Sequence, residues 1–196
     1  MEVEKTPFSA VIPTGGKSSR MGRNKLLLPL NGKTLTEIAA EKMMALGCTD
    51  IILAGNPVSV PQTRIVQDIH PGTGPLSGIH AGLAAAQYES VFVLAPDMPL
   101  VPQKLLSVLL GAHLQNGAPC TVLSHGGKLE PLLGVYEKRL APLAEQLLSG
   151  PKPSVRRFME TAGFETVEWT GEETALLNCN TPEDYEKLCT LMKSEE

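Results

Sequence analysis

Aromatic residues are scarce in this chain, which has one Trp, three Tyr and four Phe among 196 residues. Proteins that bind single-stranded nucleic acid generally stack the bases on aromatic rings inside a basic groove. With few rings and a formal net charge of -4, the chain lacks both features. We therefore expect no nucleic-acid partner.

Long apolar runs are missing as well, since no stretch approaches the roughly 18 consecutive apolar residues that a membrane-spanning helix needs. The first residues, Met1 to Lys5, are polar and acidic, and no apolar run of a signal peptide follows them. The four cysteines form no Cys-x-x-Cys pair, so we interpret them as reduced thiols and not as a disulfide framework or a zinc site. These absences predict a cytoplasmic protein without a membrane partner.

Glycine and proline are abundant instead, with 18 and 16 residues, so turns are frequent. Between the turns, short apolar runs alternate with helical patterns; the runs are 8–12, 51–54, 64–66 and 91–95. Such continuous runs are typical of a parallel sheet that helices cover on both faces. Residues 120–136 predict an antiparallel hairpin element in addition to the parallel strands. We expect a single α/β domain over residues 1–196, three-layered and Rossmann-like, with a mostly parallel sheet.

Local signals predict where several elements begin and end. Thr34 and Glu37 fit a capping box at the start of a helix. Asn31-Gly32 predicts a turn just before it. Thr181 followed by Pro182 predicts the start of the last helix.

Positive charge is concentrated near the N-terminus. Residues 1–33 carry six basic and two acidic residues, a net charge of +4, which leaves -8 for the rest of the chain. A local basic loop on an acidic protein favours a small anionic ligand over a long polyanion. On charge alone, a solvated basic loop without a ligand is an equally good interpretation.

Several familiar motifs are absent from the sequence. Gly16-Lys17-Ser18 resembles the end of a P-loop, but the glycine that the motif needs five residues earlier is Val11. A dinucleotide fingerprint beginning at Gly72 would need glycine at position 77, which is Ser77. There is no Gly-x-Ser-x-Gly elbow of an α/β-hydrolase. The four histidines show no helical pair with metal-ligand spacing, so we expect each to lie at the surface or to support a functional residue without binding a metal itself.

The loop after the first apolar run combines glycines with cations: it contains Gly15, Gly16, Ser18, Arg20, Met21, Gly22 and Lys25. Glycines allow the backbone to approach a triphosphate and to point several N–H groups at it. Arg20 can bind a phosphate with two parallel hydrogen bonds, and Lys25 supplies a point charge. The pattern therefore predicts a site for a nucleoside triphosphate.

This loop resembles the L-A-G-G-x-S-x-R-M-G-x-x-K signature of the MobA-like nucleotidyltransferases, and further motifs follow in the family's order. The matching segments are 72–79 with Asp68 before it, 96–99, 130–132 and 178–183. The resemblance covers nearly the whole chain and implies the family's nucleotidyltransferase fold. The implied reaction transfers GMP from GTP to the phosphate group of molybdenum-loaded molybdopterin and releases pyrophosphate.

The resemblance also implies roles for individual residues. Nucleotide binding would involve Pro13, Thr14, Gly15, Gly16, Lys25, Asp68 and Asp97. Arg20, Lys25 and Asp97 would be catalytic, with Asp97 binding Mg²⁺. Arg156, Asn178 and Asn180 would face the acceptor. The implied partners are GTP and molybdopterin, together with molybdoenzymes or their chaperones.

Other interpretations of the same residues stay open at this point. Asp68 and Asp97 could serve only as turn residues, and Asn178 and Asn180 could only shape the turn before the last helix. Gly15-Gly16 resembles the guanine-specific members, while Pro13-Thr14 departs from the family's Leu-Ala. The alternatives are a cytidylyltransferase, a transferase for another phosphorylated acceptor, or a non-catalytic nucleotide-binding or cofactor-delivery module. A mere binding module would not need the metal carboxylate.

Overall fold

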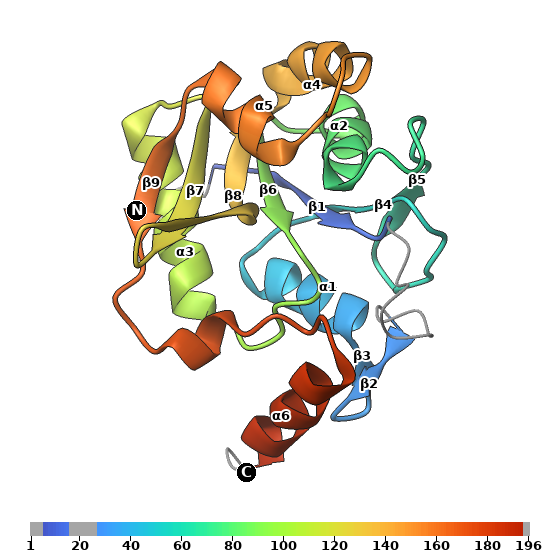
Figure 1. Ribbon diagram of the computed structural model, residues 1–196, viewed down its shortest axis with the longest axis vertical. Coiled ribbons are helices and arrows are strands. Elements are labelled where there is room, and N and C mark those ends of the chain that lie inside the picture. Colours follow the sequence, from blue (N-terminus) through green and yellow to red (C-terminus); the bar gives the residue numbers. More distant parts are fainter. Residues whose placement is uncertain (1–5, 16–26, 194–196) are drawn as a thin grey trace.

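The computed structural model describes residues 6–15 and 27–193. In this part of the chain, strands from most of the sequence join one central sheet (Figure 1). Their spatial order is β5 (Arg64–Val66), β4 (Asp50–Ala54), β1 (Ser9–Pro13), β6 (Ser90–Leu94), β8 (Lys128–Glu137), β7 (Cys120–His125) and β9 (Glu165–Glu168).

The sheet is mostly parallel, as the sequence predicts. β1 pairs in parallel with β4 and β6, β4 with β5, and β7 with β9. Among the described strands of this sheet, β8 alone runs in the opposite direction, between β6 and β7. The predicted hairpin is therefore present as β7–β8, but its return strand is inserted into the middle of the sheet, which the sequence pattern did not indicate.

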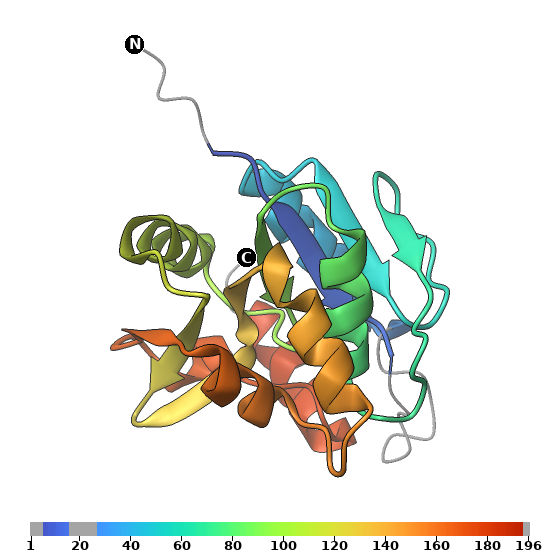
Figure 2. The same cartoon turned by 90° about the horizontal axis from the view of Figure 1, so that it is seen from above.

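Helices cover both faces, which confirms the three-layer α/β prediction (Figure 1). One face carries α1 (Leu35–Ala45) and α3 (Gln103–Asn116), and the other carries α2 (Pro75–Ala85), α4 (Ala141–Leu148) and α5 (Val155–Ala162). In the view from above, α2 and α4 lie side by side (Figure 2). None of the helices in residues 6–15 and 27–193 has the length and apolar character to cross a bilayer.

Alternate residues of the central strands point into two separate cores, because successive side chains of a strand face opposite sides. On β1, Ile12 packs with the core under α1 and α3, and its neighbour Val11 packs with the core under α2. Both side chains are fully buried. The continuous apolar runs in the sequence therefore reflect burial on both faces.

The local signals in the sequence act as predicted. The Thr34 hydroxyl accepts from the Glu37 amide (3.2 Å) and the Glu37 carboxylate accepts from the Thr34 amide (2.6 Å), which completes the capping box of α1. Before it, a small hairpin joins β2 (Pro29–Leu30) to β3 (Lys33–Thr34). Thr181 and Asp184 cap α6 (Pro182–Lys193) in the same reciprocal way.

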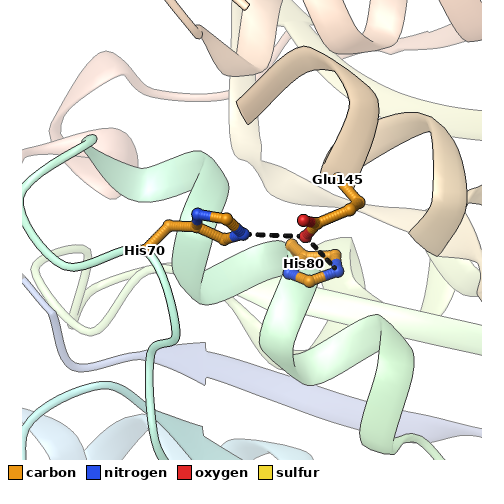
Figure 3. Close-up of side chains that lie close together, drawn as sticks. All are labelled: His70, His80 and Glu145. Atoms are coloured by element: carbon orange, nitrogen blue, oxygen red, sulfur yellow. Dashed lines mark hydrogen bonds and ion pairs between the residues drawn. The ribbon is translucent and has the colours of Figure 1, made fainter. Parts of the chain in front are cut away.

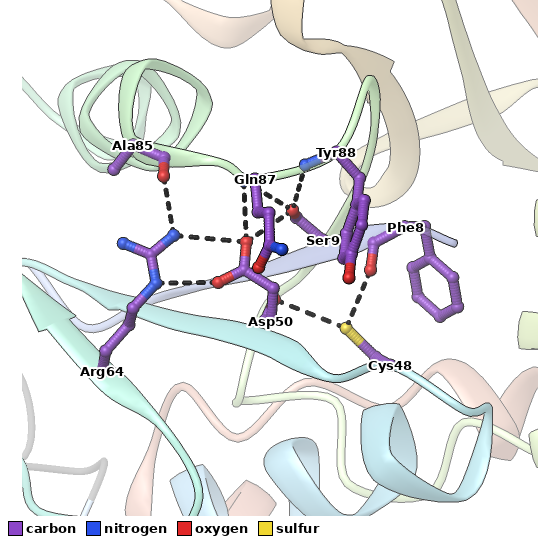
Figure 4. A network of polar contacts seen from close by, with 8 residues as sticks. All are labelled: Phe8, Ser9, Cys48, Asp50, Arg64, Ala85, Gln87 and Tyr88. Atoms are coloured by element: carbon purple, nitrogen blue, oxygen red, sulfur yellow. Dashed lines mark hydrogen bonds and ion pairs between the residues drawn. The ribbon is translucent and has the colours of Figure 1, made fainter. Parts of the chain in front are cut away.

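A buried polar network ties the amino-terminal ends of three strands together (Figure 4). The Asp50 carboxylate on β4 accepts from the Ser9 hydroxyl of β1 (2.6 Å) and from Arg64 Nε of β5 (2.7 Å). It also accepts from the Gln87 amide (2.9 Å) in the connection between α2 and β6. Burial by itself would raise the pKa of Asp50, but the hydrogen bonds from these partners outweigh it and leave the pKa below its ordinary value.

Helix α2 lies unusually close to the sheet because glycines face the strands. A Cβ added to Gly82 would stand 2.3 Å from Cγ2 of Val11, so no larger residue fits at this point of contact. One turn earlier, a Cβ on Gly78 would lie 3.5 Å from Cβ of Pro13. The small residues of α2 therefore let its axis approach the centre of the sheet.

We expect Gly82→Ala to lower the free energy of unfolding by about 1–3 kcal/mol, because the new methyl group overpacks buried Val11. Gly111→Ala is the matched control, since its Cβ meets nothing within 4 Å on α3. There the same change should raise stability by up to about 1 kcal/mol through helix propensity. Urea denaturation measures both, and equal effects of the two substitutions would contradict the close packing of α2.

We expect Asp50→Asn to cost about 1–3 kcal/mol of stability at neutral pH, because the buried donors lose a charged acceptor. A carboxyl group with a depressed folded pKa contributes stability above its unfolded pKa and loses it as the pH falls through the folded pKa. The native chain should therefore lose stability on acidification below about pH 4. The free energy of unfolding of Asp50→Asn, measured against pH, should fall less steeply there, and parallel curves would refute the assignment.

Candidate active site

The strand order reverses at β1, because the chain runs outward from β1 through β4 to β5 and then returns to the other side of β1 to form β6. After β1 the chain crosses through α1 to β4, and after β5 it crosses through α2 on the other face to β6. In open α/β sheets, ligands bind in the crevice at such a topological switch point. The loop after β1, Asp68 and Asp97 all follow the carboxyl ends of strands at this edge.

Backbone groups shape the start of the loop after β1. The Thr14 amide donates to the Ala54 carbonyl (2.8 Å), and the Thr14 hydroxyl donates to the Asn56 carbonyl (2.9 Å). Between these partners, Gly55 has a φ of +124°, and a Cβ there would stand 2.4 Å from the Gly15 nitrogen. Gly55 is a residue that the sequence interpretation missed, although a glycine directly after a buried strand is a signal for such close backbone approach.

Asp68 is held in a fixed orientation by two donors. Its Oδ2 accepts from the Ser77 hydroxyl (2.6 Å) at the start of α2, and its Oδ1 accepts from the His70 amide (2.9 Å). The contact with the His70 amide forms a turn, as expected if Asp68 is a turn residue. Asp68 also lines a cavity, so its part in the turn is compatible with the predicted binding role.

This first cavity has a volume of about 420 Å³ and opens at the carboxyl ends of β1, β4 and β5. It is lined by Gly15, Gly55, Asn56, Pro57, Ile65, Gln67, Asp68, Pro71 and Gly72. Its walls therefore combine exposed backbone with amide and carboxylate groups. Such a surface can bind a heterocycle through hydrogen bonds without ring stacking.

Asp97 follows β6 directly and is tied to a distant segment. Its backbone carbonyl accepts from the Cys179 amide (2.8 Å), which places Asp97 beside the segment that contains Asn178 and Asn180. Three of the residues predicted for the site, Asp97, Asn178 and Asn180, are thus brought near one another from two distant segments of the chain. The side chain of Asp97 is half-buried at the crevice.

A second cavity of about 390 Å³ lies on the other side of Asp97, at the ends of β7 and β8. Glu130, Asn178 and Asn180 line it, together with basic groups that the sequence interpretation did not assign: His125, Lys128 and Lys187. Burial raises the pKa of Glu130, the charge of Asp97 raises it further, and Lys128 and His125 act in the opposite direction. The charge of Asp97 therefore reaches Glu130, although Asp97 itself is not among the residues that line this cavity.

Arg156 has a different environment from the other predicted acceptor residues. It lies on α5, its side chain is 74% exposed, and its Nε pairs with Glu160 Oε1 at 2.8 Å. It is not among the described residues that line the second cavity. Its assignment to the acceptor stays a prediction, and so do those of Asn178 and Asn180, although these two do lie at the cavity.

Gly16, Arg20 and Lys25 lie outside the described residues. The loop that carries them leaves the described part of the chain at Gly15, at the edge of the first cavity. The roles of these three residues therefore remain predictions from the sequence.

Comparison with known proteins identifies relatives along nearly the whole chain. The model of a family described as the MobA-like NTP transferase domain matches residues 10–167. A probable molybdenum cofactor guanylyltransferase of Carboxydothermus hydrogenoformans is 35% identical, over 96% of this chain and 98% of the relative. The molybdenum cofactor guanylyltransferase of Xanthomonas euvesicatoria is 30% identical, over 93% of this chain and 94% of the relative.

Solved structures share the fold. Molybdopterin-guanine dinucleotide biosynthesis protein A from Archaeoglobus fulgidus superposes with a TM-score of 0.80 at 24% identity, covering 95% of this chain and 99% of that one. A CMP:2-keto-3-deoxy-manno-octonic acid synthetase in complex with CTP gives a TM-score of 0.77 at 17% identity, covering 97% and 100%. The sheet order and the layers described above are therefore those of known nucleotidyltransferases.

Proposed function

The chain belongs to the MobA-like NTP transferase family, and from this membership and its geometry we propose that it is a molybdenum cofactor guanylyltransferase. It transfers GMP from GTP to the phosphate group of molybdenum-loaded molybdopterin. The products are the guanine dinucleotide form of the cofactor and pyrophosphate. Its relatives from Carboxydothermus hydrogenoformans and Xanthomonas euvesicatoria carry the guanylyltransferase name.

The observation that supports this proposal most strongly is that Asp97 follows β6, the strand that separates the strands of the first cavity from those of the second. The strand order places β1 and β4, with the first cavity, on one side of β6, and β8, with the second cavity, on the other. A transferase needs this arrangement, because donor and acceptor must meet at one reacting phosphorus. In our proposal, GTP occupies the first cavity and molybdopterin the second.

The reaction forms a bond between an acceptor phosphate oxygen and the α-phosphorus of GTP, and it breaks the bond to the β-phosphate. A phosphate nucleophile is already ionised, so the site needs no general base. Two anions must approach each other, so catalysis depends on positioning and on neutralising charge. We assign that neutralisation to Arg20 and Lys25 on the GTP side.

The residues around Asp97 fit a magnesium ion. Mg²⁺ prefers carboxylate oxygens, and it is usually held by one or two of them together with substrate phosphates. Asp97 would hold the ion, and Glu130 is a carboxylate close enough for its pKa to respond to the charge of Asp97. When bound, Mg²⁺ would supply positive charge to the phosphate oxygens.

On the acceptor side, the second cavity is lined by the basic groups His125, Lys128 and Lys187 and by the acidic groups Glu130, Glu173 and Asp184. In our proposal, the two lysines bind the phosphate of the acceptor. The Nδ1 atom of His125 lies 2.9 Å from the Trp169 carbonyl, which orients its ring. Asn178 and Asn180 would contribute neutral donors and acceptors for the heterocycle, and Arg156 would take part only if the acceptor extends to α5.

We expect Asp97→Asn to abolish pyrophosphate release from GTP and molybdenum-loaded molybdopterin, because the change removes the charge that holds the metal. Glu41→Gln is the matched control, since its carboxylate is exposed on α1 and pairs with Lys33, away from both cavities. A coupled pyrophosphate assay measures both variants, with circular dichroism as a check on folding. Full activity of Asp97→Asn would disprove the metal assignment.

We expect GTP to give the highest kcat/KM in a panel with CTP, ATP and UTP. Guanine presents adjacent N–H donors, and the Asp68 carboxylate can accept from them. Asp68→Asn should lower kcat/KM for GTP about 10- to 100-fold, in line with the loss of a charged hydrogen bond. Ser77→Ala removes only the hydroxyl that orients Asp68, so it should lower kcat/KM for GTP less than Asp68→Asn does.

Two results would change the proposal. Faster turnover of CTP than of GTP would identify a cytidylyltransferase. An unchanged kcat/KM in Asp68→Asn would remove Asp68 from the nucleotide site.

A further inference from the structure

Two histidines and a glutamate meet on the face of the sheet that carries α2 and α4 (Figure 3). His70 lies in the loop before α2, His80 lies within α2, and Glu145 lies on α4. The Nε2 atoms of His70 and His80 lie 2.8 Å and 3.2 Å from the same carboxylate oxygen of Glu145. All three potential ligand atoms lie within 4.8 Å of one another.

We propose that His70, His80 and Glu145 form a binding site for one Zn²⁺ ion, with a water molecule in the fourth position. This site is separate from the magnesium site at Asp97, and its existence does not depend on the proposed transferase activity.

The donor set selects zinc over magnesium. Imidazole nitrogens suit Zn²⁺ and other late transition metals, whereas Mg²⁺ prefers oxygen ligands. Two histidines and one carboxylate with an open fourth position are an established ligand combination for Zn²⁺. In a tetrahedral site with bonds of about 2.1 Å, ligand atoms are about 3.4 Å apart. The two nitrogen–oxygen distances, 2.8 Å and 3.2 Å, are shorter than this value, and all three donor atoms lie within 4.8 Å of one another, so side-chain rotations would have to move Glu145 away from the rings to admit an ion.

The cluster is buried on one side and open on the other. The His80 side chain is 8% exposed, whereas those of His70 and Glu145 are 26% and 43% exposed. An ion can therefore enter beside Glu145, and a water molecule can complete its coordination from the same direction. Burial lowers the pKa of His80, which favours the neutral ring that a metal ligand requires.

His80 has a second feature that its structural role leaves unexplained. Its Nδ1 atom is buried and has no hydrogen-bond partner among the described residues. Buried polar atoms without partners are rare in native proteins, and an ion on Nε2 would not itself satisfy Nδ1. Because no group competes at Nδ1, the ring can carry its proton there when a metal replaces the Nε2 hydrogen that faces Glu145.

The backbone of His70 holds this side chain firmly in place. Its amide donates to Asp68 (2.9 Å), and its carbonyl accepts from the Thr73 hydroxyl (2.7 Å). A ligand on such a fixed loop loses little conformational entropy when it binds an ion. A bound ion would join this loop and α2 to α4, which lies more than fifty residues further along the chain.

The test uses the full chain after removal of metals with a chelator. Calorimetric titration with Zn²⁺ should show one ion bound per chain. Co²⁺ should give the visible absorption of a four- or five-coordinate site with nitrogen and oxygen ligands. The Zn²⁺ affinity of Glu145→Gln and of His70→Ala should each fall at least tenfold. Glu145→Gln keeps an oxygen that can accept both imidazole hydrogens, so we expect it to fold.

Control variants separate this site from others. His125→Ala and Glu160→Gln remove a histidine and a carboxylate outside the cluster and should leave the Zn²⁺ affinity unchanged. Zn²⁺ should raise the melting temperature of the native chain but not that of Glu145→Gln. Three results would overturn the proposal: no binding by the native chain, equal affinity in the cluster variants, or a Co²⁺ spectrum with the charge-transfer band of a cysteine thiolate.

Discussion

The close contact between α2 and β1 is the constraint on which both functional regions depend. Gly82 leaves no room for a side chain against Val11, so the helix has one position over the sheet. From that position its first turn directs Ser77 to Asp68, at the first cavity. Further along, the same helix directs His80 to Glu145 on α4. A larger residue at this contact would move both groups together, because helices are rigid over such distances.

Most of the fold could be predicted from the sequence because its signals are local. The continuous apolar run that ends before Pro96 has no polar alternation, and it became β6, a strand buried on both faces. The pairing of Thr34 with Glu37 acts over a single helical turn, so its residues alone indicate the cap. The place of β8 could not be predicted in this way. Whether a hairpin lies at the edge of a sheet or inside it depends on contacts with β6, which precedes it by more than thirty residues.

In the candidate site, too, local sequence signals could be read in advance, whereas contacts between distant segments could not. Asp68 and Asp97 could be found because they follow strands, and parallel strands end at one edge of the sheet. Gly55 was missed because its importance comes from the backbone of Gly15 across the crevice. The cluster of His70, His80 and Glu145 was missed for a related reason. Its members are ten and sixty-five residues apart, and only the packing of α4 against α2 brings them together.

The reversed direction of β8 has a consequence for how such a protein can diversify. The first cavity, where we propose that the nucleotide binds, is built from residues that follow strands, and the strands fix their positions. The second cavity, which we propose for the acceptor, is built around the turn between β7 and β8, where His125 and Lys128 lie. A hairpin turn can change its length or charge without moving the paired strands beside it. The recognition of new acceptors can therefore evolve at this turn while the phosphate chemistry next to it stays the same.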